Sequence, residues 1–259
     1  MHVAPVAAWL RHVFPCKVAD PVQQFCAMVA LCGCDFARNL QRLGPRSLWK
    51  LRHRLQNSHL SQPEASVQEI VEDVHRAARF VRHHAKEYGI DPKRMGVFGG
   101  SSGGHLALML ATRGGAGDPR AADPVDRESS AVQAAAVFYP VTDLLNLGPS
   151  TENPGDGGPP KSFVNSFGPK AADLNEWKKI GREISPIFHV TEELPPVFIA
   201  HGDADTLVPL EQSTRFQQKA AELGREVLIT VRPGEKHGWR TMIWDAHLFA
   251  AWMKEQLRK

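Results

Sequence analysis

A stretch rich in glycine and serine could present a nucleophile to a substrate. Ser101 lies within Gly99-Gly100-Ser101-Ser102-Gly103, between an apolar run at 95–98 and a helix-like apolar run at 105–111. Glycines two residues before and after the serine fit a strained turn from strand to helix, where a side chain would clash with the neighbouring backbone. Such a turn exposes the Ser101 hydroxyl above the sheet and aims the N–H of Ser102 at a developing oxyanion. The spacing therefore predicts a nucleophile elbow with Ser101 as the nucleophile.

Two later loops carry the residue types that a serine nucleophile needs. An apolar run at 196–200 leads into a loop with Asp203 and Asp205, and a second run at 226–231 leads into a loop with His237. A serine hydroxyl is a weak nucleophile, and an imidazole can both accept and return its proton. A carboxylate is then needed to hold the imidazole in the correct tautomer. We predict His237 as the base and Asp205 as the acid. Asp203 is the rival acid, but it directly follows the strand and is expected to brace the loop.

The order Ser, Asp, His along the chain is that of α/β-hydrolases and differs from the chymotrypsin-like and subtilisin-like orders. From about Gln62 to the C-terminus, the sequence resembles the esterases and lipases of this class, particularly the hormone-sensitive-lipase-like branch and its bacterial feruloyl-esterase and acetyl-esterase relatives. The segments that carry the resemblance are 71–74, 85–94, 138–144 and 184–187. Ser102 also fits the bare Gly-x-Ser-x-Gly pattern. Aligning 103–107 with the family's helix start selects Ser101.

The sequence departs from this family at the second half of the oxyanion hole. Relatives usually carry a His-Gly-Gly loop near the N-terminus, whose backbone N–H groups complete the hole, and no such tripeptide precedes Ser101 here. The nearest candidate is Cys32-Gly33-Cys34, which follows the apolar run 27–31. The candidate oxyanion and binding residues are Ser102, Gly100, Gly33 and Cys34.

The resemblance implies a serine carboxylic-ester hydrolase that works through an acyl-enzyme on short-chain acyl esters, such as acetyl or feruloyl esters of plant polysaccharide. Two alternatives stay open. A peptidase of the prolyl-oligopeptidase type shares the fold and the triad order, although it usually brings a gating domain. A weakly active or inactive relative would keep the triad and lack a full oxyanion hole.

The N-terminal part of the chain does not follow the family. Residues 36–63 contain no Asp or Glu and include six basic residues: Arg38, Arg42, Arg46, Lys50, Arg52 and Arg54. The rest of the chain is slightly acidic, and signatures of nucleic-acid recognition are absent from the sequence, so we expect no nucleic-acid partner. Residues 1–61 are interpreted as an atypical segment, either a cap or degenerate first strands. Residues 62–259 are the expected catalytic core, and the whole chain is expected to form one structural domain.

Composition agrees with a soluble enzyme, and no cofactor or metal is expected. The chain has 259 residues, of which 42% are hydrophobic, and a net charge of +3. No apolar segment reaches the roughly 18 residues of a membrane span, and no convincing signal peptide is present. All four cysteines lie in the first 34 residues and lack zinc-site spacing, so buried or free thiols are expected. We expect a small-molecule ester as partner and a cytoplasmic location, and leave the oligomeric state open.

The elements that must position these residues alternate along the chain. Apolar residues between Val67 and Ala85 recur every three and four positions, which predicts an amphipathic helix ending near Gly89. Strands are expected at about 95–98, 133–138, 196–200 and 226–231, and helices at about 102–112, 211–223 and 245–257. This pattern predicts an α/β-hydrolase fold, a mostly parallel sheet flanked by helices. His201 is expected to have a structural role, and residues 148–158 are expected to form a loop. Three aromatic residues could line the substrate pocket, although packing in the core is the simpler expectation: Phe163, Phe167 and Trp177.

Overall fold

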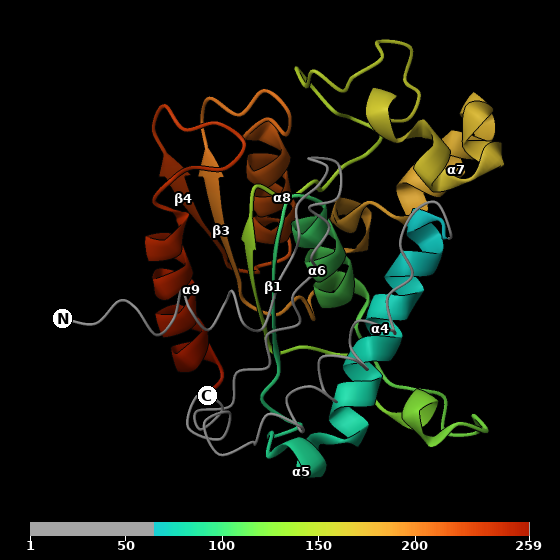
Figure 1. The fold of residues 1–259 in the computed structure, drawn as a ribbon, viewed down its shortest axis with the longest axis vertical. Coiled ribbons are helices and arrows are strands. Elements are labelled where there is room, and N and C mark those ends of the chain that lie inside the picture. The colour runs from blue at the N-terminus through green and yellow to red at the C-terminus, as the bar shows by residue number, and fades with distance from the viewer. Residues whose placement is uncertain (1–64, 259) are drawn as a thin grey trace.

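A four-stranded parallel sheet forms the centre of the computed structural model, which describes residues 65–258 (Figure 1). Its strands lie in chain order: β1 (Gly96–Gly100), β2 (Ala134–Phe138), β3 (Val197–Gly202) and β4 (Val227–Arg232). The register pairs Gly100 with Phe138 and Gly202 with Arg232, so the carboxyl ends of the strands meet at one edge. The four predicted strands are confirmed, each within two residues at either end.

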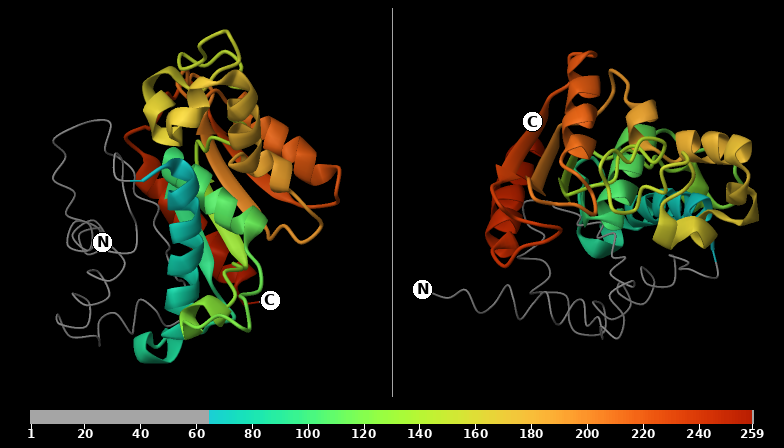
Figure 2. Two further views of the ribbon diagram at one scale, coloured as in Figure 1. Left: turned by 90° about the vertical axis from the view of Figure 1, so that its right-hand side faces the viewer. Right: turned by 90° about the horizontal axis from the view of Figure 1, so that it is seen from above.

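Helices cover both faces of the sheet, as parallel strands require. The helices in chain order are α4 (Val67–His83), α5 (Ala85–Tyr88), α6 (Ser102–Arg113), α7 (Leu174–Glu183), α8 (Glu211–Ala221) and α9 (Met242–Gln256). Shorter 3-10 turns are η2 (Pro124–Arg127), η3 (Lys161–Phe167), η4 (Pro169–Ala172) and η5 (Pro186–His189). Figure 2 shows α9 on one face and α4, α6 and α8 on the other. The predicted α/β-hydrolase architecture of a parallel sheet flanked by helices is confirmed over the described residues.

Alternate residues of the strands pack into two separate hydrophobic cores, one on each face of the sheet. Val97, Val137 and Ile199 pack with α4, α6 and α8 in the larger core. Their neighbours Phe138 and Ala200 point to the opposite face, where they pack against α9. Because successive strand residues face opposite sides of a sheet, a strand buried on both faces reads as a continuous apolar run. This is the pattern from which the strands were predicted.

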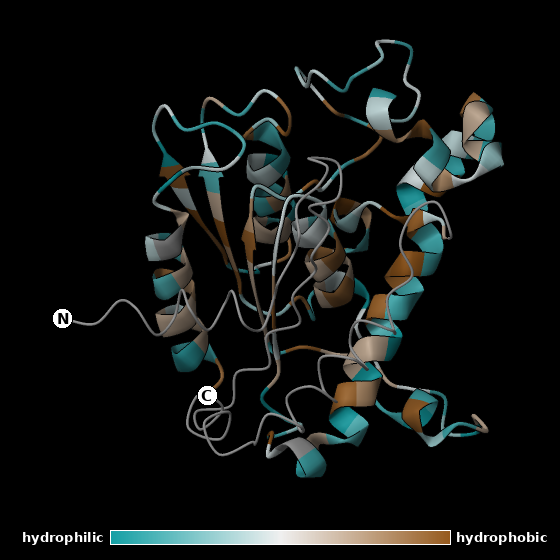
Figure 3. Ribbon diagram, viewed as in Figure 1, coloured by the Kyte–Doolittle hydropathy of each residue, from teal (hydrophilic) through white to brown (hydrophobic). Residues whose placement is uncertain are grey.

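Helix α4 begins at a capping box. The Ser66 hydroxyl accepts from the N–H of Glu69, and the Glu69 carboxylate accepts from the N–H of Ser66. Its buried residues recur at the predicted spacing of three and four. Figure 3 shows hydrophobic bands alternating with hydrophilic ones along the helix. The helix is interrupted at His84, and the short α5 that follows ends at Gly89 in the left-handed conformation, with φ of 65°. The predicted single helix is therefore two helices, with the terminus where it was expected.

Between β2 and α7, residues 148–173 extend away from the sheet, and we call them the excursion segment (Figure 1, olive to yellow). Phe167 and Trp177 are 4% and 0% exposed and form a third core with Leu144, Ala171 and Ile184. Phe163 packs partly buried against them. These aromatic residues thus belong to packing that holds the excursion segment and α7 together.

Several expectations fall on residues outside the described range. They include the atypical segment 1–61, the basic run at 36–63, the four cysteines and the candidate oxyanion residues Gly33 and Cys34. Across residues 65–258, the helices are too short or too polar to span a bilayer.

Candidate active site

Ser101 sits at the turn between β1 and α6 with a backbone that few non-glycine residues adopt. Its φ is 55° and its ψ is −123°. A Cβ added at Gly99 would lie 2.2 Å from the carbonyl oxygen of Gly103, so only glycine fits the start of the turn. The N–H of Ser101 donates to the carbonyl of Phe138 at 3.0 Å, which ties the strained residue to β2. The structure thus has the tight elbow that the glycine spacing predicts, with backbone strain stored at one serine.

A chain of hydrogen bonds links Ser101, His237 and Asp205. His237 Nε2 lies 2.9 Å from Ser101 Oγ, and His237 Nδ1 lies 2.7 Å from Asp205 Oδ2. A carboxylate only accepts, so Nδ1 carries the proton that it donates to Asp205. Nε2 is then left with a lone pair toward the Ser101 hydroxyl. The structure brings together the three residues singled out in the sequence, in the tautomer that a general base requires.

Asp205 is a buried carboxylate held on both oxygens. Its side chain is fully buried, and its Oδ1 accepts from the N–H groups of Leu207 at 3.0 Å and Val208 at 2.9 Å. Burial by itself raises the pKa of Asp205, but the nearby His201 imidazole and the hydrogen bonds from His237 and the Val208 N–H outweigh it and hold the pKa well below its usual range. The carboxylate therefore stays ionised beside the imidazole.

His201 is buried at the end of β3 and supports residues 203–210, which carry Asp205 and are called the acid loop. Its Nε2 lies 2.8 Å from the carbonyl oxygen of Val208, to which it donates, and its Nδ1 accepts from the Ser213 hydroxyl at 2.7 Å. The same Nε2 is 3.6 Å from Asp205 Oδ2. These contacts fit the expected structural role, and they also place His201 beside Asp205.

Asp203 connects the acid loop to the loop that carries His237. Its exposed carboxylate accepts from the N–H of Gly234 at 2.6 Å, and its N–H donates to the carbonyl of Arg232 at 3.2 Å. The N–H of Ala204 also donates to the carbonyl of Glu235 at 3.0 Å. These bonds match the bracing role expected for Asp203, and they bring the two loops to the distance at which Asp205 meets His237.

A partly buried ion pair connects the His237 loop to α9. The Arg232 guanidinium at the end of β4 pairs with Asp245 in the first turn of α9. Trp239 Nε1 donates to the other oxygen of Asp245 at 2.8 Å, and Asp245 is 2% exposed. Both ends of the loop are thereby fixed. Sequence reasoning missed this cluster, because nothing in the local pattern distinguishes Asp245 from other polar residues of a helix.

Tyr139 was also missed and lies against the imidazole. It follows β2 with φ of 32°, a strained value, and its ring centroid is 4.4 Å from that of His237. Its hydroxyl contacts Met242 Sδ at 3.5 Å. Burial, and then the charge of Asp205, raises the pKa of Tyr139 to about 12, so the phenol stays protonated. The sequence signals were an aromatic residue directly after an apolar strand and its place in segment 138–144, which carries the family resemblance.

The candidate oxyanion residues fall into two groups. Ser102 is the first residue of α6, where backbone N–H groups lack partners within the helix. Gly100 is the last residue of β1, and a Cβ there would meet Tyr139 Oη at an ordinary 3.6 Å. Gly33 and Cys34 lie outside the described residues.

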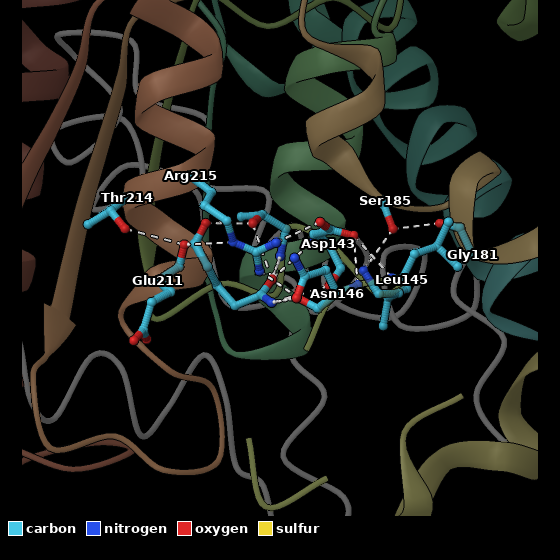
Figure 4. A network of polar contacts seen from close by, with 11 residues as sticks. Asp143, Leu145, Asn146, Gly181, Ser185, Glu211, Thr214 and Arg215 are labelled. Atoms are coloured by element: carbon cyan, nitrogen blue, oxygen red, sulfur yellow. Dashed lines mark hydrogen bonds and ion pairs between the residues drawn. The ribbon is translucent and has the colours of Figure 1, made fainter. Parts of the chain in front are cut away.

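A polar network anchors the chain just before the excursion segment (Figure 4). Asp143 Oδ1 accepts from the N–H groups of Leu145 and Asn146, and its Oδ2 pairs with Arg215 Nη1 of α8 at 2.8 Å. Ser185, after α7, accepts from the N–H of Leu144 at 2.9 Å. These contacts therefore fix the position of the chain at the start of the excursion segment.

Comparisons with known proteins identify a family for the chain. The sequence profile of the BD-FAE family matches residues 52–220, a range that includes Ser101 and Asp205. Esterase LipQ of Mycobacterium tuberculosis is 36% identical over 152 residues, which cover 59% of this chain and 34% of that protein. The probable carboxylic ester hydrolase LipM of the same organism is 31% identical over 157 residues, covering 61% and 35%. This chain spans about a third of the length of these two relatives.

Similar solved structures have the same fold. The crystal structure of an acetyl ester-xyloside bifunctional hydrolase from Caldicellulosiruptor lactoaceticus aligns with a TM-score of 0.59 and 27% identity, over 76% of this chain and 69% of that one. The profile match extends over more than half of the chain and includes the elbow and the acid loop. The protein therefore belongs to the BD-FAE family of α/β-hydrolase esterases.

Proposed function

We propose that the protein is a serine carboxylic-ester hydrolase that acts through an acyl-enzyme on short-chain acyl esters. The observation that carries the proposal is the continuous hydrogen-bonded chain from Asp205 through His237 to Ser101. Each residue follows the carboxyl end of a different parallel strand, where ligands of such sheets are usually bound. Ser101 would be the nucleophile, His237 the general base and Asp205 the acid.

The geometry suits a two-step acyl transfer. Ser101 Oγ attacks the ester carbonyl carbon while His237 Nε2 takes the hydroxyl proton. The tetrahedral intermediate collapses as the imidazolium returns this proton to the leaving alcohol, which gives the acyl-enzyme. A water molecule then attacks the acyl carbon, with His237 again as base, and the carboxylic acid leaves with Ser101 restored. Asp205 stays ionised and stabilises the imidazolium in both steps, and the N–H of Ser102 would bind the oxyanion.

Short acyl groups are the proposed substrate class. Support comes from the family and from the Caldicellulosiruptor relative, whose name describes an acetyl ester hydrolase. Acetyl or feruloyl esters on plant polysaccharide fall within this proposal. An amide substrate is the competing possibility, because peptidases can use the same triad on the same fold.

The test is turnover of p-nitrophenyl acetate, butyrate and octanoate beside an aminoacyl p-nitroanilide. We expect hydrolysis of the short esters, and loss of both hydrolysis and organophosphonate labelling in Ser101→Ala. Mass spectrometry of the labelled wild type should place the adduct on Ser101. An adduct on Ser102, or turnover of the anilide alone, would contradict the proposal.

A further inference from the structure

The excursion segment contacts the acid loop from the side opposite Asp205. Ser150 Oγ donates to the carbonyl of Leu207 at 2.6 Å, across 57 residues of sequence. The N–H of Thr151 donates to the carbonyl of Thr206 at 2.9 Å. Thr206 and Leu207 directly follow Asp205. These two bonds therefore join the excursion segment to the residues that hold the Asp205 carboxylate.

The two bonded carbonyls belong to the same two peptide groups that bind the carboxylate. The peptide between Thr206 and Leu207 accepts from Thr151 on its C=O and donates its N–H to Asp205 Oδ1. The next peptide accepts from Ser150 and donates its N–H, that of Val208, to the same oxygen. In a trans peptide, C=O and N–H point in opposite directions. A donor on the outer side therefore fixes the orientation of the N–H on the inner side.

The Ser150 hydroxyl is oriented for this purpose. It is 8% exposed, and its oxygen accepts from the N–H of Glu152 at 3.0 Å, which leaves its single proton for Leu207. Hydrogen bonds in series polarise one another, so a donor to the carbonyl strengthens the N–H bond to the carboxylate.

We propose that Ser150 and the N–H of Thr151 are positioning groups for Asp205, which they hold by fixing the two peptides that bind its carboxylate. The inference rests on the proposed function, in which Asp205 orients His237. It makes the excursion segment part of the support of the proposed triad.

The test is a double-mutant cycle with p-nitrophenyl acetate. Ser150→Ala should lower kcat roughly 5- to 10-fold, about the effect of one hydrogen bond, with KM within about twofold. Ser150→Thr keeps the hydroxyl and should restore kcat. If Ser150 acts through the acid, Ser150→Ala should have no further effect in an Asp205→Asn background. Losses that multiply, or a wild-type kcat in Ser150→Ala, would overturn the inference.

Ser129 provides a matched control, because its hydroxyl also donates to a backbone carbonyl, that of Gly115, at 3.0 Å, and accepts from the N–H two residues later. Ser129→Ala should leave kcat unchanged, and equal losses in both alanine variants would also overturn the inference.

A second readout needs no turnover. The proton between His237 Nδ1 and Asp205 should give a downfield signal in the proton NMR spectrum, and this signal should weaken or move upfield in Ser150→Ala but not in Ser129→Ala. An unchanged signal would contradict the inference. Failure of the wild type to hydrolyse esters would contradict the proposed function. The NMR comparison would still test whether Ser150 positions Asp205.

Discussion

Gly202 and Glu235 are so close that a Cβ on the glycine would lie 2.2 Å from the glutamate carbonyl oxygen. This contact sets the distance between the loops of Asp205 and His237. We expect Gly202→Ala to push the loops apart, to lower kcat about 100-fold or more, and to destabilise the fold by about 1–3 kcal/mol. Steady-state kinetics and urea unfolding measure both effects. At Gly115 an added Cβ meets nothing within 4 Å, so Gly115→Ala is the control, and equal activity of the two variants would refute the argument.

The two aspartates of the acid loop should differ sharply in their effect on catalysis. Asp205→Asn replaces the charged carboxylate that accepts from His237 Nδ1 with a neutral amide, which no longer enforces the tautomer. It is expected to lower kcat by roughly 10³-fold or more, as is His237→Ala. Asp203 binds Gly234 at the surface, so Asp203→Asn should reduce kcat far less. The kcat values of the three variants on one activated ester decide the point. A larger loss in Asp203→Asn would show that the acid is misassigned.

Ser101, Asp205 and His237 could be proposed as a triad from the sequence because each lies in the turn or loop after an apolar run, in the order Ser, Asp, His. Ser101, Asp205 and His237 carry local signals: flanking glycines, a strand end and a characteristic loop. The strands could also be predicted from the sequence, since strands buried on both faces give continuous apolar runs.

Contacts between distant segments carry no such signal. The bond from Ser150 to Leu207 and the ion pair between Arg232 and Asp245 depend on how loops and helices come together in space. The strain at Tyr139 likewise follows from its surroundings and not from its neighbours in sequence.

Two buried histidines should make the stability of the fold depend on pH. Burial is the main cause that lowers the pKa of His75 and of His105 from 6.5 to about 4. Between these values the unfolded chain binds protons that the folded chain does not, so stability is complete above about pH 6.5 and falls toward pH 4. Each group contributes on the order of 3 kcal/mol to this loss.

Urea unfolding at pH 7 and pH 4.5 measures this effect, and His105→Gln is the informative variant. Its amide can still donate to the carbonyl of Ile184, which His105 Nε2 contacts at 2.5 Å, but it does not titrate. The variant should lose less stability than the wild type over this range. The same pH dependence in both proteins would rule out His105 as a contributor.

The oxyanion hole is expected to limit the rate of ester hydrolysis. The sequence before Ser101 lacks the His-Gly-Gly loop that supplies the second donor in relatives, and Ser102 provides one N–H at the start of α6. Removing one oxyanion donor typically costs about 10² to 10³ in kcat. A good leaving group lessens the need to stabilise the tetrahedral oxyanion. We therefore expect a slow esterase with a strong preference for activated esters.

Turnover of p-nitrophenyl acetate and ethyl acetate by the same enzyme tests this expectation. The ratio of the two kcat values should greatly exceed that of a full-strength esterase assayed in parallel. A kcat on ethyl acetate near the enzyme median of about 10 per second would contradict it. So would a phosphonate complex in which a second N–H, such as that of Gly33 or Cys34, lies within roughly 3 Å of the phosphonyl oxygen. Only the phosphonate complex would identify which residues supply the second donor.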